Sequence, residues 1–502
     1  MIYRKIELGF LYFFVFIVVC STGFAGKIVY PWHSTTAIVK TGESFEVWFD
    51  ADSGQTVNSV ELDGPYNKVN TTKAISTGDW VYDPMSGNRY NTRITVTVPA
   101  AAPADRYDLI LNTSCGQAVS GGAVKVIRDY KTRYKILHIS DTHLGQGKIP
   151  KGLTEAKLTA IVDMSNMINP EMVFVTGDNI TWTARDFQDR VNLFFEGDHA
   201  AGVKGLRDMN AASFVVAGNH DYTEGVEDRS GFFKSKATFW NTYYGLQNYD
   251  FKYGNTRCLM FNDGWNDSNY NDQLTDLANW LSGEGAGGKL RLMACHIARR
   301  ETMGPFAHDN NIGLALVGHN HHLGKKNPYK LDDRFSLYYA QSVREYCEFN
   351  LFQVDDSTGN YTAMGYANTD PNSDSYGRAT GCCRVLQNDD RKNNPDTSVW
   401  KYNLTLVYAN NNDGTASCNT ATLVNKFDFP IPDARVRFVM PKGPVYAVST
   451  GTIEQQFDGD AYRIVDVSID LNPNSTTTAG IAPVDIPAAS RPLSGMEARG
   501  DD

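Results

Sequence analysis

The sequence predicts an α/β region between two regions built from β-strands, and three observations support this. Residues 27–130 hold short, often alternating apolar runs separated by Gly, Pro, Asn and Asp. In residues 131–368, apolar runs alternate with amphipathic segments of helical spacing. Strand-like runs return after residue 369. The chain has 502 residues, 42% of them hydrophobic and 21% charged, which is typical of a globular protein with several domains.

The first 25 residues have the features of a signal peptide. Two basic residues precede an apolar core, Leu8–Cys20, and the small residues after it fit cleavage following Ala25. The core is too short to span a bilayer comfortably, and a retained N-terminal anchor is the alternative. We therefore expect residues 1–25 to be removed and the protein to be secreted, periplasmic or at the cell surface. No later segment is apolar enough for a transmembrane helix.

Residues 27–130 predict a β-sandwich of immunoglobulin-like size. Runs such as "SFEVWFD" and "RITVTVP" alternate apolar and polar residues, as strands with one buried face do. No cluster of catalytic residue types occurs in this region. We expect a spacer or a docking module, because function depends on a site and none is visible here.

Residues 131–368 predict an α/β domain. The segment "GLTEAKLTAIVDMSNMI" has helical spacing and lies between the apolar runs "YKILHIS" and "EMVFVT". A second amphipathic segment, "DQLTDLANWLSG", lies between two further apolar runs. Strand, helix and strand in repetition indicate an α/β fold. The segment "EFNLFQVDDSTGNYTAMGYA" predicts a closing hairpin.

Residues 369–502 predict a small C-terminal β domain with a loose polar tail. The region begins with irregular stretches rich in Asn, Asp and Gly and continues with strand-like runs such as "ARVRFVMP". Export permits disulfides, and four late cysteines could form two bridges in any of three connectivities: Cys347, Cys382, Cys383 and Cys418. Cys258 and Cys295 lie in apolar runs and are interpreted as buried thiols.

The net charge of -10 argues against a long nucleic acid as the main partner, because an acidic surface repels a phosphate backbone. A small phosphate ester remains compatible with this charge, since bound metal cations reverse the local field.

Five apolar runs of the central region each end in Asp, Asn or His. The carboxyl ends of strands form the edge at which open α/β sheets bind ligands. Side chains with nitrogen and oxygen donors that converge there make a metal site. The residues at these ends are Asp141, His143, Asp178, Asn219, His220, Asp221, His296, His319 and His321.

Each of these signals has an ordinary structural explanation when taken alone. Asp178 after Gly is typical of a turn or a helix cap, and His319 with His321 could be an exposed loop pair. A single D-x-H is weak evidence, since it occurs by chance in a chain of this length. The five ends together, with suitable residue types at each, favour the metal site.

The motifs "SDTH", "GDN", "GNHD", "CH" and "GHNH", in this order, resemble those of the calcineurin-like metallophosphoesterase superfamily. The resemblance covers about residues 131–368 and implies a two-sheet αββα core with flanking helices and a dinuclear metal site. The family's purple acid phosphatase branch is disfavoured, because Asn179 and Ile180 follow Asp178 where that branch has a tyrosine ligand.

The resemblance also implies a role for each residue. Asp178 bridges both metals, and His220 hydrogen-bonds a phosphoryl oxygen or protonates the leaving group, with Asp221 orienting it. The alternative for His220 is simple packing. The other ligands fall into two sets, Asp141, His143 and His321 for one metal, and Asn219, His296 and His319 for the other.

These inferences predict an exported, metal-dependent phosphoric ester hydrolase. Two divalent ions, Mn, Zn or Fe, would hold a bridging hydroxide that attacks a phosphodiester or a phosphomonoester. One alternative is a strict phosphomonoesterase. Another is a non-catalytic surface binding protein on a vestigial hydrolase core, which would be expected to lack a ligand. The partner we expect is a small phosphoester substrate, and the sequence leaves the oligomeric state open.

Overall fold

The computed structural model describes most of the chain. The described residues are 26–83, 87–145, 152–180, 187–221, 236–263, 270–321, 324–330, 335–387 and 392–484. The predicted signal peptide, residues 1–25, lies outside them. Within the described residues, none of the helices combines the length and apolar character needed to cross a bilayer.

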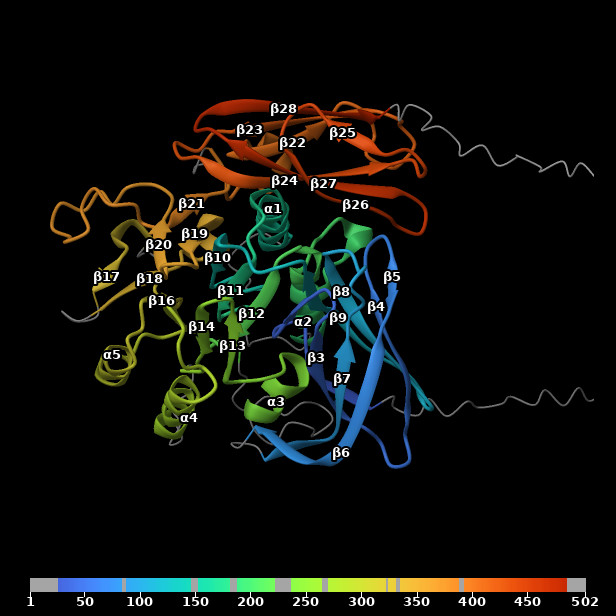
Figure 1. Cartoon of the computed structure of the whole chain (residues 1–502). Helices are drawn as coiled ribbons and strands as arrows, with labels where there is room; N and C mark the ends of the chain where they lie inside the picture. Colours follow the sequence, from blue (N-terminus) through green and yellow to red (C-terminus); the bar gives the residue numbers. More distant parts are fainter. Residues whose placement is uncertain are drawn as a thin grey trace, which may run out of the picture.

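The N-terminal region folds as two facing β-sheets, drawn in blue in Figure 1. Alternation along the strands directs Phe45, Val47 and Phe49 of β3 into the shared core, while their neighbours are more exposed. One sheet has the order β1 (Lys27–Tyr30), β3 (Ser44–Asp50), β7 (Asn88–Thr97) and β6 (Thr72–Asp83). The other has the order β2 (Ala37–Lys40), β9 (Gly116–Ile127), β8 (Arg106–Thr113), β4 (Val57–Asp63) and β5 (Lys68–Asn70).

The first core sheet has parallel strands at its centre. Its strands β10 and β11 pair in parallel, as do β11 and β12, because helical crossovers connect them. The predicted hairpin forms, with β19 antiparallel to β10 and to β20. The sheet order is β12 (Ala212–Val216), β11 (Met172–Thr176), β10 (Arg133–Ile139), β19 (Glu348–Asp355) and β20 (Asn360–Ala363), with β21 (Cys382–Arg384) on β19.

The second core sheet repeats this design. Strands β14, β15, β16 and β18 run parallel, and β13 and β17 are antiparallel edges. The sheet order is β13 (Tyr249–Tyr253), β14 (Thr256–Met260), β15 (Leu290–Cys295), β16 (Leu314–Val317), β18 (Ser336–Tyr339) and β17 (Tyr329–Lys330).

The two core sheets pack face to face with helices outside them, which confirms the predicted α/β class. Phe174 and Phe214 of the first sheet meet Leu292 and Leu316 of the second in one buried core. Helix α1 (Leu153–Ile168) covers the outer face of the first sheet. Helices α4 (Tyr270–Ser282) and α5 (Arg300–Asp309) cover the outer face of the second. Strands covered on both sides are buried throughout, as β11 and β12 are.

Three short helices lie close to the loops at the carboxyl ends of the core strands or beside the N-terminal region. They are α2 (Phe187–Glu196), α3 (Lys236–Tyr243) and the single turn α6 (Val343–Tyr346).

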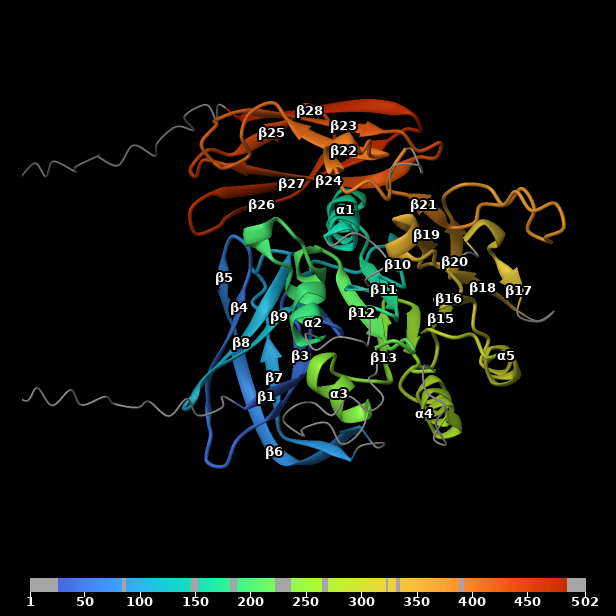
Figure 2. The same cartoon turned by 180° about the vertical axis from the view of Figure 1, so that it is seen from behind.

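The C-terminal region is a second pair of facing sheets, drawn in orange and red above α1 in Figure 1. Their apolar faces continue the core that surrounds α1, so α1 is buried on two sides. Figure 2 shows the same layering from behind. One sheet has the order β22 (Leu404–Tyr408), β23 (Asn419–Asn425), β28 (Ser475–Pro483) and β25 (Tyr446–Val448). The other has β24 (Ile431–Met440), β27 (Arg463–Leu471) and β26 (Thr452–Asp458).

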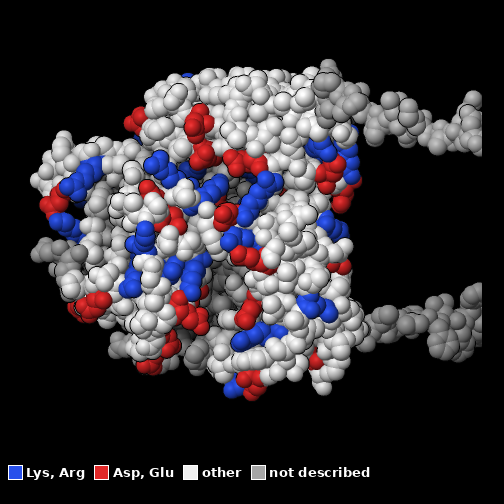
Figure 3. Space-filling model, viewed as in Figure 1, with Lys and Arg blue, Asp and Glu red and all other residues white. Residues whose placement is uncertain are grey.

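A cavity of about 980 Å³ opens where the N-terminal region, α1 and the C-terminal region meet. Figure 3 shows Lys, Arg, Asp and Glu side chains mixed around the hollow on this face of the molecule. Its lining charges pair with one another, as Lys204 does with Asp163 and Arg437 with Asp105. None of the predicted site residues lines it.

The seven cysteines in the described residues are free thiols. The two bridges considered for the late cysteines therefore do not form in this structure. Cys347, Cys382 and Cys383 are buried at the first core sheet, and Cys418 is exposed in the C-terminal region, so the four do not come together as two pairs.

Candidate metal centre

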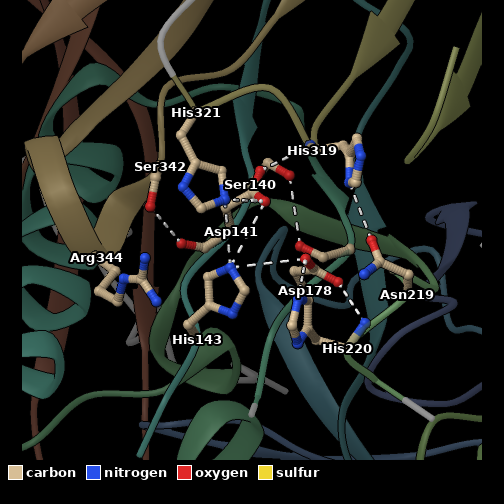
Figure 4. A network of polar contacts seen from close by, with 12 residues as sticks. Ser140, Asp141, His143, Asp178, Asn219, His220, His319, His321, Ser342 and Arg344 are labelled. Atoms are coloured by element: carbon tan, nitrogen blue, oxygen red, sulfur yellow. Dashed lines mark hydrogen bonds and ion pairs between the residues drawn. The ribbon is translucent and has the colours of Figure 1, made fainter. Parts of the chain in front are cut away.

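All nine predicted site residues lie in loops that leave the carboxyl ends of parallel core strands. Strands β10, β11 and β12 of the first sheet lead to the first six, and β15 and β16 of the second lead to the three histidines His296, His319 and His321. Because the two sheets face each other, their carboxyl edges meet over one site (Figure 4).

The backbone at this edge takes a conformation that most residues avoid. Asp141, His143, Asp178 and His319 all have a positive φ, between 47° and 68°. Hydrogen bonds between neighbouring loops hold this backbone conformation. The His319 amide donates to Asp141 Oδ2 at 3.0 Å, and the His220 amide donates to Asp178 Oδ1 at 2.7 Å. Strained backbone that the structure maintains in this way is concentrated at functional sites.

Asp141, His143 and His321 form the first ligand group. Their donor atoms all lie within 4.8 Å of one another. His321 Nε2 is 3.0 Å from Asp141 Oδ1 and 3.4 Å from His143 Nε2. Two imidazole nitrogens and a carboxylate oxygen around one point are the donors that a divalent transition metal prefers.

Asp178, His296 and His319 form the second ligand group, again within 4.8 Å. The amide oxygen of Asn219 joins them, 3.1 Å from His296 Nε2 and 3.0 Å from His319 Nδ1. The structure thus brings together the same two sets of residues that the resemblance implies.

Asp178 lies between the two groups. Its Oδ2 is 3.3 Å from His296 Nε2 in the second group and 3.6 Å from His143 Nε2 in the first. Burial by itself would raise the pKa of this carboxyl, but His296, His143 and His220 lower it below its ordinary value. Asp178 is therefore an anion placed to be shared by both groups.

Burial and the nearby carboxylates shift the pKa values of two of the histidines in opposite directions. Burial lowers the pKa of His143 to about 4. For His296 burial acts in the same direction, but the adjoining Asp178 outweighs it and raises the pKa to about 10. A divalent cation in this position would compete for the same carboxylate.

His220 faces the site from its open side. Its ring packs edge-on against His143 with centroids 5.0 Å apart, and its Nε2 is 4.0 Å from Asp178 Oδ2. The side chain is 31% exposed, against 2% for His143. His220 is thus accessible to a substrate while adjoining both groups.

Asp221 is buried between the loop of Asp178 and the loop of Asn219 and His220. Its carboxylate accepts hydrogen bonds from the backbone amides of Gly218, Asn179 and Ile180, at 2.8, 2.9 and 3.2 Å, and from the Asn179 side chain. A buried carboxylate is used where several amides would otherwise lack acceptors. Asp221 therefore ties the loop of Asp178 to the loop of Asn219 and His220.

Several supporting residues were not identified from the sequence. Asp263, at the end of β14, accepts from the amides of His296 and Ile297 at 2.9 and 2.8 Å. The Thr176 carbonyl accepts from His296 Nδ1 at 2.6 Å. Asp263 closes a sixth apolar run, "RCLMFND", and could have been found by the same rule as the other strand ends. A backbone carbonyl leaves no signal in a sequence.

The donor set fits a pair of divalent cations. In the first group two imidazole Nε2 atoms, each a donor of a lone pair when neutral, face each other across 3.4 Å. This arrangement is repulsive unless a cation or a proton lies between them. With Asp178 shared, the residues supply two adjoining sites of nitrogen and oxygen ligands.

Comparison with known proteins agrees with this geometry. Residues 134–323 match the model of the calcineurin-like phosphoesterase family, a shorter stretch than the 131–368 predicted. No curated protein matches the chain. Among solved structures, a purple acid phosphatase from yellow lupin (Lupinus luteus) is similar, at 12% identity over 72% of this chain and 74% of its own, with a TM-score of 0.41. A dimetal phosphatase from Danio rerio is similar at 11% identity over 46% of this chain and 95% of its own, with a TM-score of 0.28. The family match covers the strands and loops that build the site.

Proposed function

We propose that this protein is an exported hydrolase of small phosphate esters that uses two divalent cations. The observation that carries the proposal is the gathering of seven ligand side chains from five strand ends into two adjoining groups, with Asp178 between them. Export rests on the signal-peptide features of residues 1–25, and the cation is Mn, Zn or Fe on the ligand types alone.

In this proposal the residues divide the work. Asp141, His143 and His321 would hold one cation, and Asn219, His296 and His319 would hold the other, with Asp178 available to both. When bound, such a pair lowers the pKa of a water so that it can attack phosphorus, and offsets the charge that develops. Two carboxylates neutralise half of the four positive charges, so the site attracts an anionic ester.

His220 supplies the proton chemistry. Its half-exposed imidazole lies beside both ligand groups, within reach of a phosphoryl oxygen or a leaving alkoxide. Asp221 keeps the His220 loop in register with Asp178 through the shared amides. A cysteine nucleophile is disfavoured, because burial raises the pKa of the neighbouring Cys295 thiol well above its ordinary value.

The test is a comparison of two chromogenic esters. Purified protein loaded with Mn²⁺, Zn²⁺ or Fe²⁺ is given bis-p-nitrophenyl phosphate and p-nitrophenyl phosphate. We expect turnover of at least one ester, with the diester or both favoured, and loss of turnover after chelation. A strict phosphomonoesterase would cleave only the second. Protein that binds two cations and cleaves neither ester would overturn the proposal in favour of a binding protein on a vestigial core.

Two substitutions assign the roles. Asp178→Ala should abolish turnover and weaken the binding of both cations, while Asp276→Ala, an exposed carboxylate on α4, should change neither. His220→Ala should lower kcat by roughly 10²–10⁴ and leave metal content near normal. Turnover retained in Asp178→Ala would contradict its shared position.

A further inference from the structure

The two ligand groups differ in the partner of a histidine nitrogen that points away from the ligand group. His296 turns its Nδ1 toward a neutral backbone carbonyl, that of Thr176, at 2.6 Å. His321 turns its Nδ1 toward a carboxylate, Glu345 Oε1, at 3.2 Å. In both cases Nε2 faces the ligand group and the outer nitrogen, Nδ1, has a partner, but only for His321 is the partner of Nδ1 charged.

Glu345 is itself held in place by the short helix α6. The guanidinium of Arg344 donates from Nη2 to the same oxygen, Glu345 Oε1, at 2.5 Å. Ser342 caps the helix by accepting from the Glu345 amide, and its hydroxyl donates to the Asp141 carbonyl at 2.9 Å. Figure 4 shows Ser342 and Arg344 beside Asp141 and His143, on the side of the site that carries His321. One helical turn therefore connects to the first ligand group at two points.

The Arg344 side chain is only 10% exposed, and the Glu345 side chain is 30% exposed. A buried charge without a partner is costly, and in this ion pair each charge has the other as a partner. The ion pair thus fixes the Glu345 carboxylate beside His321 Nδ1. A histidine that donates Nδ1–H to a carboxylate has its tautomer and ring orientation set, and its Nε2 becomes a stronger ligand.

We propose that Glu345, held by Arg344, is a positioning residue that selectively strengthens metal binding by the Asp141, His143 and His321 group. The inference rests on the proposed dinuclear site, and it adds that the two cations are held unequally. Within the described part of the chain, the outer nitrogen of His296 has the Thr176 carbonyl as its partner and not a carboxylate. Metal binding by the first group therefore depends on a side chain, Glu345, that can be substituted without replacing any of the ligand residues.

The experiment measures metal content rather than turnover. Wild type, Glu345→Gln and Arg344→Gln are loaded with two equivalents of Zn²⁺ and titrated with a chelator, and the retained metal is counted by elemental analysis. We expect Glu345→Gln to lose one equivalent at roughly 10–100-fold lower chelator and to keep the second as wild type does. Arg344→Gln keeps the Glu345 carboxylate but removes its ion-pair partner. It should lower the chelator concentration that removes the same metal equivalent by a smaller factor. Glu284→Gln, an exposed carboxylate in the core domain, is the matched control.

A double-mutant cycle identifies which site is affected. If Glu345 acts through His321, Glu345→Gln should add nothing to the metal loss of His321→Ala, and should add its full effect to that of His296→Ala. Wild-type affinity for both equivalents in Glu345→Gln would overturn the inference, as would equal loss of both, which indicates a general structural role. Neither outcome bears on whether the wild-type protein cleaves phosphoesters, so the proposed function is tested separately.

Discussion

The two flanking β regions are built alike but are joined to the core in different ways. The N-terminal region adds backbone to the first core sheet. Thr35 forms an antiparallel bridge with Phe214 of β12, and the Val215 amide donates to the Ser34 carbonyl at 2.9 Å. The C-terminal region instead lays an apolar face on α1, with Phe438 and Leu471 in the core that surrounds that helix.

The N-terminal attachment leads on to the metal loops. His33 Nε2 lies 3.1 Å from the Tyr243 carbonyl, and Ser34 donates to the carbonyl of Tyr244. The Tyr244 hydroxyl in turn donates to Asp221 Oδ1 at 3.4 Å. Asp221 joins the two loops that carry Asp178, Asn219 and His220, so this flank is two side chains away from the ligands.

The C-terminal attachment consists mainly of apolar contacts with α1, together with a hydrogen bond from Lys135, near the start of β10, to the Pro432 carbonyl. Two sandwiches of the same class can therefore contribute differently to one domain. Directional hydrogen bonds transmit position to a site, whereas apolar contact mainly contributes stability. Damage to the N-terminal attachment should therefore alter metal binding, and damage to the C-terminal attachment should alter stability alone.

The largest effect is expected at Arg106, the buried guanidinium that joins the N-terminal region to the core. It donates to the carbonyls of Leu206, Met209 and Ala211 and to the Ser213 hydroxyl, all within 3.1 Å. Because each stranded buried acceptor costs about 1–3 kcal/mol, Arg106→Met should lower the free energy of unfolding by more than about 3 kcal/mol. Urea denaturation measures the loss, and metal affinity should fall with it. The exposed Arg89→Met is the control.

The contact between the C-terminal region and α1 is tested by Leu471→Ala. Truncating this buried side chain should cost about 2–5 kcal/mol in unfolding free energy, through lost burial and a residual cavity. We expect kcat and metal content of the folded protein to stay at wild-type values. A drop in metal affinity as large as that of Arg106→Met would contradict the expected difference between the two flanks.

A third prediction concerns the place where the flanks touch each other. Arg437 of β24 pairs with Asp466 at 2.8 Å and with Asp105 of the N-terminal region at 2.8 Å. Burial alone would raise the pKa of Asp466, but Arg435 and Arg437 lower it below its ordinary value. A carboxyl with a lowered folded-state pKa stabilises the fold above its unfolded pKa, and this contribution is lost as the pH falls through the folded value.

Stability should therefore decline below about pH 4, with a contribution on the order of 2 kcal/mol from this cluster. Thermal melts from pH 7 to pH 3 measure it, and Asp466→Asn should flatten the acid limb. An unchanged acid limb would show that the cluster does not govern the acid sensitivity.

The smallest expected effect is the sharpest test of the N-terminal connection. Tyr244→Phe removes one hydroxyl and keeps the ring that stacks on Trp240. We expect a loss of about 0.5–1.5 kcal/mol, seen as weaker metal binding by the group containing Asp178 and as a lower kcat. Removing a hydroxyl at the opposite flank, by Tyr408→Phe, should leave both unchanged. Equal effects in the two variants would show that the connection through Tyr244 carries nothing specific to the site.

The residue types and their order along the chain were sufficient to predict the α/β core and the residues that the structure gathers at the candidate metal centre. Apolar runs ending in Asp, Asn or His specify strand ends, because a parallel sheet delivers all its carboxyl ends to one edge. The boundary predicted at residue 368 could not include β21, which pairs with β19 from residues 382–384. Its short run, "CCR", carries no periodic signal.

The order of residues along the chain defines local features, namely which runs become buried strands and which side chains stand at their ends. How those ends are supported depends on contacts that form only in the folded protein. Asp221 turned to three amides, Glu345 reached His321 from a single helical turn, and residues 34–36 joined the edge of β12. The physical reason is that these contacts join segments far apart in the chain, and depend on directions that no short pattern of residues encodes.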